Sequence, residues 1–123
     1  MKYDVKFTTQ FKRDLKLAEK QHKDISELLA VIEQLAEGRR LEEKYRDHEL
    51  SGSYKGCREC HIEPDWLLIY EYVNDVLVLL LYRLGTHSEL FKKSRALYDP
   101  SAPAEFFSAA YFARPPNLFL KLP

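Results

Sequence analysis

The stretch Cys57–Leu84, CRECHIEPDWLLIYEYVNDVLVLLLYRL, decides the fold of this chain of 123 residues. It contains two turn sequences, EPD and ND, and three strand-like runs, which span residues 57–62, 66–73 and 76–84. The ND turn has the two-residue length typical of a β-hairpin. The last run is apolar almost throughout, as expected of a central strand that is covered on both faces. The stretch therefore predicts a small, largely antiparallel sheet.

One strand and two helices are predicted ahead of this stretch. Polar and apolar residues alternate over residues 3–8, as in a strand with one buried face. A helix then begins at the threonine pair 8–9, because threonine is a preferred N-cap. Asp24 and Glu27 have the spacing of a capping box, and an apolar stripe follows them until Gly38, which ends the second helix. The predicted class is α+β, two helices packed on the sheet, in the order β-α-α-β-β-β.

We predict one domain, residues 1–95, and a C-terminal extension, residues 96–123, that is either docked or dispensable. A short helix capped by Ser101 is the one element expected in the extension. The N-terminus lacks the apolar region of a secretory signal, and the longest apolar run is too short to cross a bilayer. Nineteen basic and nineteen acidic residues leave no net charge to indicate nucleic acid. We expect a cytoplasmic protein without membrane contact.

The residues from Cys57 to His61 spell C-x-x-C-H, the pattern that attaches a c-type haem. Side chains alternate along a strand, so Cys57 and Cys60 should point to opposite faces and cannot both reach one haem or one zinc ion. The sequence has no second C-x-x-C to complete a zinc site. We therefore expect neither a haem nor a zinc ion at these two cysteines. The same alternation places Glu59 and His61 on one face.

Two further histidines flank the predicted sheet on loops. His48 precedes the three strands, and His87 follows the last one, while Asp65 lies in the turn after His61. An antiparallel arrangement can bring the three imidazoles to one end or face. Imidazole suits both general acid and general base catalysis, because its ordinary pKa of about 6.5 leaves both forms populated near neutrality. As an alternative, the three histidines can bind zinc with an open fourth position, as in a metal-dependent hydrolase.

Several sequence blocks, in order, resemble the YafQ-type branch of the RelE superfamily of bacterial toxins over roughly residues 1–93. The blocks are KYRDH (44–48), L-x-GS-x-KG (50–56), R-x-x-H-x-EPDW (58–66), LIY (68–70) and GTH-x-x-LF (85–91). The resemblance implies the RelE fold and a type II toxin that cleaves mRNA in the ribosomal A site. It also implies a cognate antitoxin as partner and no metal or organic cofactor.

The resemblance also implies a set of active-site residues, which are His48, His61, Asp65, His87 and Phe91. Family members usually carry aspartate at the position of Glu59, so this chain keeps the charge there on a longer side chain. We expect Asp65 and Glu59 to orient the imidazoles.

RNA carries its own nucleophile, the 2′-hydroxyl group beside each phosphate. Cleavage needs a base to remove that proton and an acid to protonate the leaving 5′-oxygen. We predict that His87 is the acid and that His48 or His61 is the base. The ring of Phe91 offers a surface on which an unstacked base can lie.

Basic side chains provide candidate contacts to RNA phosphates. The first helix carries a basic stripe that includes Lys12 and Lys16, and three further candidates near the strands are Lys55, Arg58 and Arg83. Binding modules on the same scaffold are an alternative: ParE-like relatives act on DNA gyrase without this histidine set, and an inactive protein can still bind an antitoxin.

Overall fold

The computed structural model describes residues 2–92, so the predicted extension, including the helix expected at Ser101, lies outside the described residues. The strands are β1 (Asp4–Phe7), β2 (His48–Glu49), β3 (Arg58–Glu63), β4 (Trp66–Val73) and β5 (Val78–Gly85). The helices and helical turns are α1 (Thr9–Lys20), α2 (Ile25–Ala36), η1 (Glu43–Tyr45), η2 (Gly52–Tyr54), η3 (Asn74–Val76) and η4 (Ser88–Lys92).

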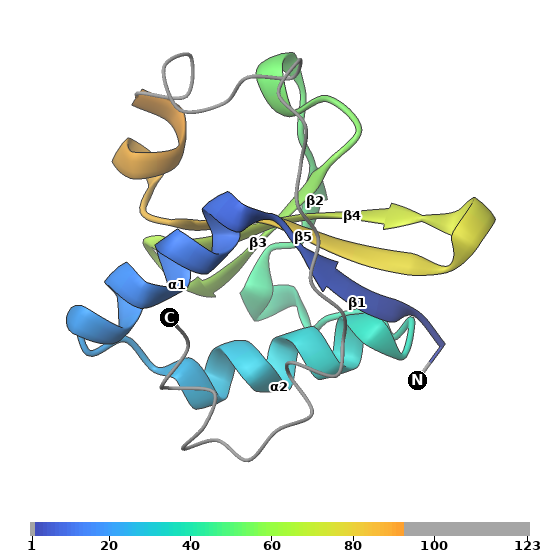
Figure 1. Cartoon of the computed structure of the whole chain (residues 1–123), viewed down its shortest axis with the longest axis horizontal. Helices are drawn as coiled ribbons and strands as arrows, with labels where there is room; N and C mark the ends of the chain where they lie inside the picture. The colour runs from blue at the N-terminus through green and yellow to red at the C-terminus, as the bar shows by residue number, and fades with distance from the viewer. Residues whose placement is uncertain (1, 93–123) are drawn as a thin grey trace.

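The strands form one sheet in the order β1-β5-β4-β3-β2 (Figure 1). The β1–β5 pair is parallel, and the other three pairs are antiparallel. This confirms the predicted α+β class and the largely antiparallel sheet. The predicted order lacked β2, the two-residue edge strand, so His48 lies on a strand and not on a loop.

Both helices begin at the predicted caps. The Thr8 side chain accepts a hydrogen bond from the Phe11 amide, and the Asp24 carboxylate accepts one from the Glu27 amide. The Glu27 side chain, which a capping box would turn back toward Asp24, instead accepts a hydrogen bond from the Tyr45 hydroxyl group. Gly38 follows α2 with a φ of 77°, a left-handed conformation that glycine adopts without strain.

The connection between β4 and β5 is longer than predicted. It spans Asn74 to Leu77, and the last strand begins at Val78 instead of Val76. The η3 turn occupies most of it, and Leu77 closes it in a left-handed conformation with a φ of 52°. The ND pair therefore starts a four-residue connection and not a two-residue hairpin.

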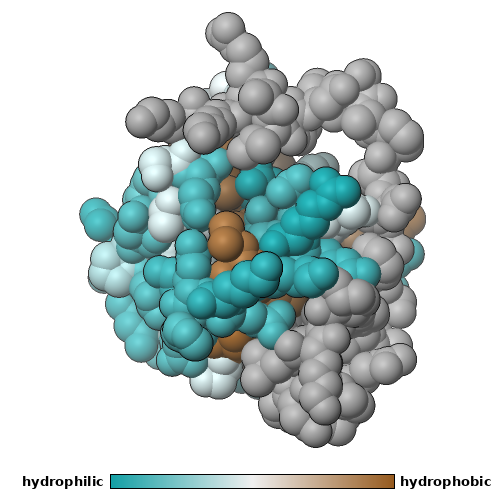
Figure 2. Space-filling view, turned by 60° about the vertical axis from the view of Figure 1, so that its left-hand side comes forward, coloured by the Kyte–Doolittle hydropathy of each residue, from teal (hydrophilic) through white to brown (hydrophobic). Residues whose placement is uncertain are grey.

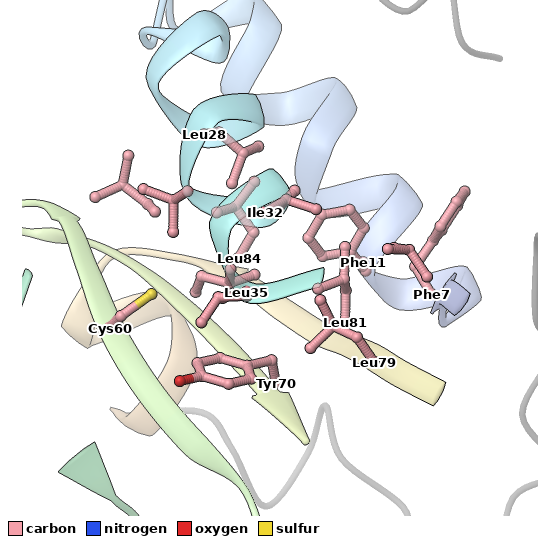
Figure 3. Close-up of a cluster of buried hydrophobic side chains, with 14 of the residues drawn as sticks. Phe7, Phe11, Leu28, Ile32, Leu35, Cys60, Tyr70, Leu79, Leu81 and Leu84 are labelled. Atoms are coloured by element: carbon pink, nitrogen blue, oxygen red, sulfur yellow. The ribbon is translucent and has the colours of Figure 1, made fainter. Parts of the chain in front are cut away.

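The sheet separates two apolar clusters. The larger one lies between the sheet and helices α1 and α2, and it includes Phe11, Leu28, Tyr70 and Leu81 (Figure 3). The smaller one lies on the opposite face, where η2 and η4 pack against β4; its buried members are Tyr54, Cys57, Leu67, Ile69 and Leu90. The chain therefore builds most of its core on the helical side and leaves the other face for shorter segments.

Within residues 2–92, side chains and not a strand make the hydrogen bonds to the C-terminal half of β5 on its β1 side. β1 pairs with residues 78–81 only. Beyond them, the Thr8 hydroxyl group donates to the Tyr82 carbonyl oxygen at 2.8 Å, and the Asp14 carboxylate accepts from the Leu84 amide at 2.9 Å. The same carboxylate accepts two hydrogen bonds from the guanidinium group of Arg83, at 2.8 and 3.2 Å. Helix α1 is thereby fastened to the strand that leads to His87.

The ion pair between Asp14 and Arg83 is buried, and their exposed fractions are 9% and 4%. Burial raises the pKa of Asp14, and the hydrogen bonds from Arg83 act in the opposite sense. Arg83 was predicted to contact RNA, but its side chain lies in the interior. The sequence placed it on the last strand without showing that α1 supplies a carboxylate to it.

Hydrophilic side chains cover most of the described surface on the face shown in Figure 2, and hydrophobic ones are visible in a narrow central band. Within residues 2–92, none of the helices is both long enough and apolar enough to cross a membrane.

We expect Asp14→Ala to lower the free energy of unfolding by about 3–5 kcal/mol, because it leaves the Arg83 charge buried without its partner. Urea denaturation monitored by circular dichroism measures the change, with the exposed Lys20→Ala on the same helix as the control. A loss below about 1 kcal/mol, similar to that of a surface substitution, would contradict the structural role of this pair.

Candidate active site

The predicted histidines gather on the sheet face opposite to the two helices. Glu59 and His61 alternate with the helix-facing Cys60 on β3, and His48 on the edge strand lies directly opposite Glu59. His87 follows the end of β5, and Phe91 lies in η4. Three segments that are far apart in the sequence therefore meet over one patch of the sheet.

Four rings form a row across this patch. The ring centroids of His48 and His61 are 6.2 Å apart, those of His61 and His87 are 5.6 Å apart, and those of His87 and Phe91 are 6.3 Å apart. His61 thus has an imidazole neighbour on each side. The spacing is short enough for one phosphodiester group to reach more than one of these rings.

Backbone carbonyl groups fix the orientation of the two histidines nearest the sheet edge. Nδ1 of His48 lies 2.7 Å from the carbonyl oxygen of Arg46, and Nδ1 of His61 lies 3.2 Å from that of Pro64. A carbonyl oxygen only accepts, so each Nδ1 carries the proton in these contacts. The Nε2 atom of each ring is left to face the active site. Arg46 adopts a φ of 49° as it leads from η1 to β2.

Glu59 joins these two rings. Its carboxylate oxygen Oε1 lies 3.3 Å from Nε2 of His61 and 3.8 Å from Nε2 of His48. The Glu59 side chain is only 4% exposed, whereas those of His61 and His48 are 11% and 50% exposed. Glu59 thus brings one negative charge to the Nε2 atoms of both rings.

His87 is oriented by Asp65. The Asp65 oxygen Oδ1 accepts from the His87 backbone amide at 2.9 Å and lies 2.7 Å from Nδ1 of the ring. The backbone hydrogen bond and then the side-chain hydrogen bond from His87 lower the pKa of Asp65. An ionised Asp65 accepts a hydrogen bond from the Nδ1–H group of His87, and the Nε2 atom is not part of this contact.

Tyr54 supports the other end of the row. Its hydroxyl group donates to the Leu90 carbonyl oxygen at 3.3 Å, and its ring meets that of Phe91 edge to face, with centroids 5.7 Å apart. Phe91 is itself 38% exposed. Sequence reasoning missed Tyr54, because the polar segment around it shows no hydrophobic periodicity.

The predicted basic contacts are not all beside the histidines. Arg58 bonds to Asp47 at 3.3 Å through Nε and lies 3.6 Å from Glu49. It is paired in register with the helix-facing Tyr70, so its side chain leaves β3 on the face opposite to Glu59. The prediction that Arg58 lies beside the site was wrong for this reason, since adjacent residues of a strand point to opposite faces.

The remaining lysines are placed differently. Lys55 is exposed directly after η2. Lys12 and Lys16 lie on α1, on the helical side of the sheet, and Lys16 is exposed while Lys12 is half-buried. Of the three, only Lys55 belongs to a segment that packs on the face with the histidines.

One group within residues 2–92 has the geometry to hold a metal ion. The ligand atoms of His48, Glu59 and His61 all lie within 4.8 Å of one another. The alternative considered from the sequence combined the three histidines, whereas the structure replaces His87 with Glu59. Two imidazole nitrogens and a carboxylate are ordinary ligands of zinc and copper.

The two cysteines lie on opposite faces of the sheet, as the alternation of side chains along a strand predicted. Cys57 belongs to the apolar cluster beneath η2 and η4, and Cys60 to the cluster under the helices. Both are buried, and neither is in a disulfide. Burial raises the pKa of the Cys57 thiol to about 12, and burial also raises that of Cys60.

Comparisons with known proteins agree with this architecture. The family model described as "Bacterial toxin of type II toxin-antitoxin system, YafQ" matches residues 3–92. The mRNA interferase toxin YafQ of Escherichia coli K12 is 42% identical over 89 residues, which are 72% of this chain and 95% of the relative.

Solved structures show the same similarity. The crystal structure of the E. coli DinJ-YafQ complex contains a chain with a TM-score of 0.67 and 41% identity, covering 72% of this chain and 98% of that one. A metal-bound toxin from Helicobacter pylori has a TM-score of 0.69 and 42% identity, covering 74% of this chain and all of that one, 100%.

We expect both thiols to resist iodoacetamide in the folded protein at pH 7–8, because the thiolate is the reactive form and burial disfavours it. Mass spectrometry should detect full modification only after unfolding in guanidinium chloride. Rapid modification of either cysteine in the native state would contradict the burial of both thiols.

Proposed function

Because the chain belongs to the YafQ family of bacterial toxins of type II toxin-antitoxin systems, we propose that it is a ribosome-dependent endoribonuclease that cleaves mRNA in the A site. The observation that carries the proposal is the row of three oriented imidazoles beside one buried carboxylate. Such a row supplies the acid and the base that RNA cleavage needs, since the 2′-hydroxyl group of RNA is the nucleophile.

His87 acts as the general acid in this proposal. Asp65 holds Nδ1, so Nε2 of the imidazolium ring points outward and can give its proton to the leaving 5′-oxygen. The half-exposed position of the ring, 54% for the side chain, allows it to meet a substrate directly. Asp65 remains ionised and stabilises the charged ring before the transfer.

His48 is the better placed of the two candidate bases. It lies on the opposite side of His61 from His87, and its ring is half exposed, whereas His61 is largely covered. A phosphate above His61 then has a base on one side and an acid on the other, as in-line displacement requires. His61, in contact with Glu59, supplies positive charge to the phosphoryl oxygens.

Two proton transfers accompany the displacement at phosphorus. His48 removes the proton of the 2′-hydroxyl group as the 2′-oxygen bonds to phosphorus. The bond from phosphorus to the 5′-oxygen breaks, and His87 protonates that oxygen. The products are a 2′,3′-cyclic phosphate and a free 5′-hydroxyl end. Positioned proton transfer of this kind typically contributes on the order of 10²- to 10⁴-fold to the rate.

Binding of the message involves Phe91 and Lys55. The exposed part of the Phe91 ring lies next to His87 and offers a stacking surface for a base, worth about 1–3 kcal/mol in single-strand binding. Lys55 provides a point charge for a phosphate. Lys12 and Lys16 lie on the helical side of the sheet, and in this proposal they contact phosphates of ribosomal RNA.

A protein antitoxin is the second partner that we propose. The E. coli relative was solved in complex with DinJ. A toxin that acts on translating ribosomes would work in the cytoplasm.

The reaction that we propose needs no metal ion. The His48, Glu59 and His61 group fits a divalent cation, which would supply Lewis-acid chemistry. The Nε2 lone pair of His48 is required to accept the proton of the 2′-hydroxyl group, so an ion held there would compete with the proposed base. Histidine acid and base catalysis at this site is therefore proposed for the metal-free form.

We expect His87→Ala to reduce cleavage of mRNA on translating ribosomes by about 10²- to 10⁴-fold, because the leaving oxygen loses its acid. Mapping of the mRNA ends should place the cuts of the wild-type protein inside A-site codons, with little cleavage of naked RNA. The matched control is His22→Asn in the exposed helix-helix loop, since asparagine tolerates the φ of 58° at that position.

Growth arrest that persists in the His87→Ala strain would point to a gyrase-directed binding module. Equal cleavage of naked and ribosome-bound RNA would contradict the dependence on the ribosome.

We expect treatment of the purified protein with EDTA, before it is added to ribosomes, to leave the cleavage rate unchanged. Treatment of the purified protein with Cu²⁺ should lower the rate, because the ion occupies the Nε2 atoms near Glu59. End mapping on ribosomes after dialysis measures both effects. Loss of activity in EDTA that returns with added zinc would favour the metal-dependent hydrolase instead.

A further inference from the structure

A cavity of about 300 Å³ opens beside the row of imidazoles, between the end of β3, η1 and the start of α2. His61 lines it, together with side chains of both charges, Glu27, Lys44, Arg46 and Glu63. Neither His87 nor Phe91 contributes to the wall. His48 is not part of the wall either, whereas Tyr45 and Ile62 of the larger apolar cluster are. The cavity therefore adjoins the central imidazole at the end of β3, toward the helical side of the sheet.

The walls of the cavity are held in place by contacts between different elements. The Tyr45 hydroxyl group donates to the Glu27 carboxylate, which ties η1 to α2, and the Tyr45 ring is only 6% exposed. This hydrogen bond, with burial, raises the pKa of Tyr45 to about 12, so the hydroxyl group remains a donor. Nζ of Lys44 lies 5.0 Å from the centroid of the same ring.

The charged groups divide into two kinds of recognition element. Lys44 and Arg46 are donors that suit a phosphate oxygen. Glu63 is an acceptor, and carboxylates recognise exocyclic amino groups such as N4 of cytosine. The Glu27 carboxylate already accepts a hydrogen bond from the Tyr45 hydroxyl group, so Glu63 is the better candidate to bind a ligand. A cavity with donors and an acceptor fits a nucleotide better than a bare anion.

We propose that this cavity, at the end of β3 beside His61, binds the nucleotide next to the scissile linkage and selects a base with an exocyclic amino group. The inference rests on the proposed function, because the row of imidazoles defines where the linkage lies. Lys44 contacts the phosphate and contributes affinity to any base. Glu63 contacts the amino group and contributes discrimination, so uracil, which lacks that group, binds less tightly.

The cavity size supports a single nucleotide. Ligand sites of proteins usually occupy about 300–1,000 Å³, and this one lies at the lower end. A second cavity of about 420 Å³ lies around Arg40 and Arg58. Arg58 is already paired with Asp47 and Glu49 there, and that cavity has no histidine in its wall, so it lacks a link to the row of imidazoles.

The test is an NMR titration of the isotopically labelled full chain with cytidine 5′-monophosphate and with uridine 5′-monophosphate. The cytosine base carries the exocyclic amino group, and the uracil base has a carbonyl oxygen in its place. We expect the cytidine nucleotide to shift the amides of Arg46, Ile62 and Glu63 in a saturable way and to bind at least about fivefold more tightly than the uridine nucleotide. Shifts confined to other segments, or equal affinities for the two nucleotides, would overturn the proposal.

Two variants separate the two contributions. Lys44→Ala should weaken both nucleotides by a similar factor, whereas Glu63→Ala should remove the preference for cytidine. Glu33→Ala, at an exposed position on α2, is the matched control and should leave both affinities unchanged. A preference for cytidine that survives Glu63→Ala would overturn the assignment of Glu63.

Cleavage on ribosomes, measured separately, distinguishes this inference from the proposed function. Cleavage without nucleotide shifts in the cavity overturns the nucleotide site alone. Saturable, selective shifts in a protein that cleaves no message on ribosomes support the nucleotide site and overturn the nuclease activity.

Discussion

The structure depends on how the C-terminal half of β5 is held. On its β1 side this half has no strand partner within residues 2–92, and the side chains of Thr8 and Asp14 supply the missing hydrogen bonds. The Asp14 carboxylate also neutralises the buried Arg83 guanidinium group. Because β5 leads directly to His87, this contact between α1 and the strand fixes the starting point of the segment that carries the proposed acid.

The two faces of the sheet differ in what they carry. The helical face holds the larger apolar cluster, and the other face holds the row of imidazoles above a smaller one. A short segment such as η4 can then be anchored by Leu90 and Tyr54 while it presents Phe91 and His87 to solvent. Substitutions on the helical face should act mainly on stability, and those on the opposite face mainly on the proposed chemistry.

Backbone geometry, more than side-chain pairing, orients the histidines near the sheet edge. The carbonyl groups of Arg46 and Pro64 each hold an Nδ1 atom, so two Nε2 atoms converge on Glu59. The Glu59 carboxylate reaches both rings. This convergence gives one group of side chains the geometry for both the proposed proton transfer and a divalent cation.

The sequence by itself determined the local structure: the caps at Thr8 and Asp24, the end of α2 at Gly38, and the strand alternation that separates the cysteines and unites Glu59 with His61. These features depend on neighbours within a few residues, which sequence patterns record. Only the tertiary structure decided that Arg83 is buried against Asp14, that Arg58 faces away from the histidines, and that Tyr54 supports Phe91. Such pairs join segments that are distant in the chain, and their partners are fixed only when the layers dock.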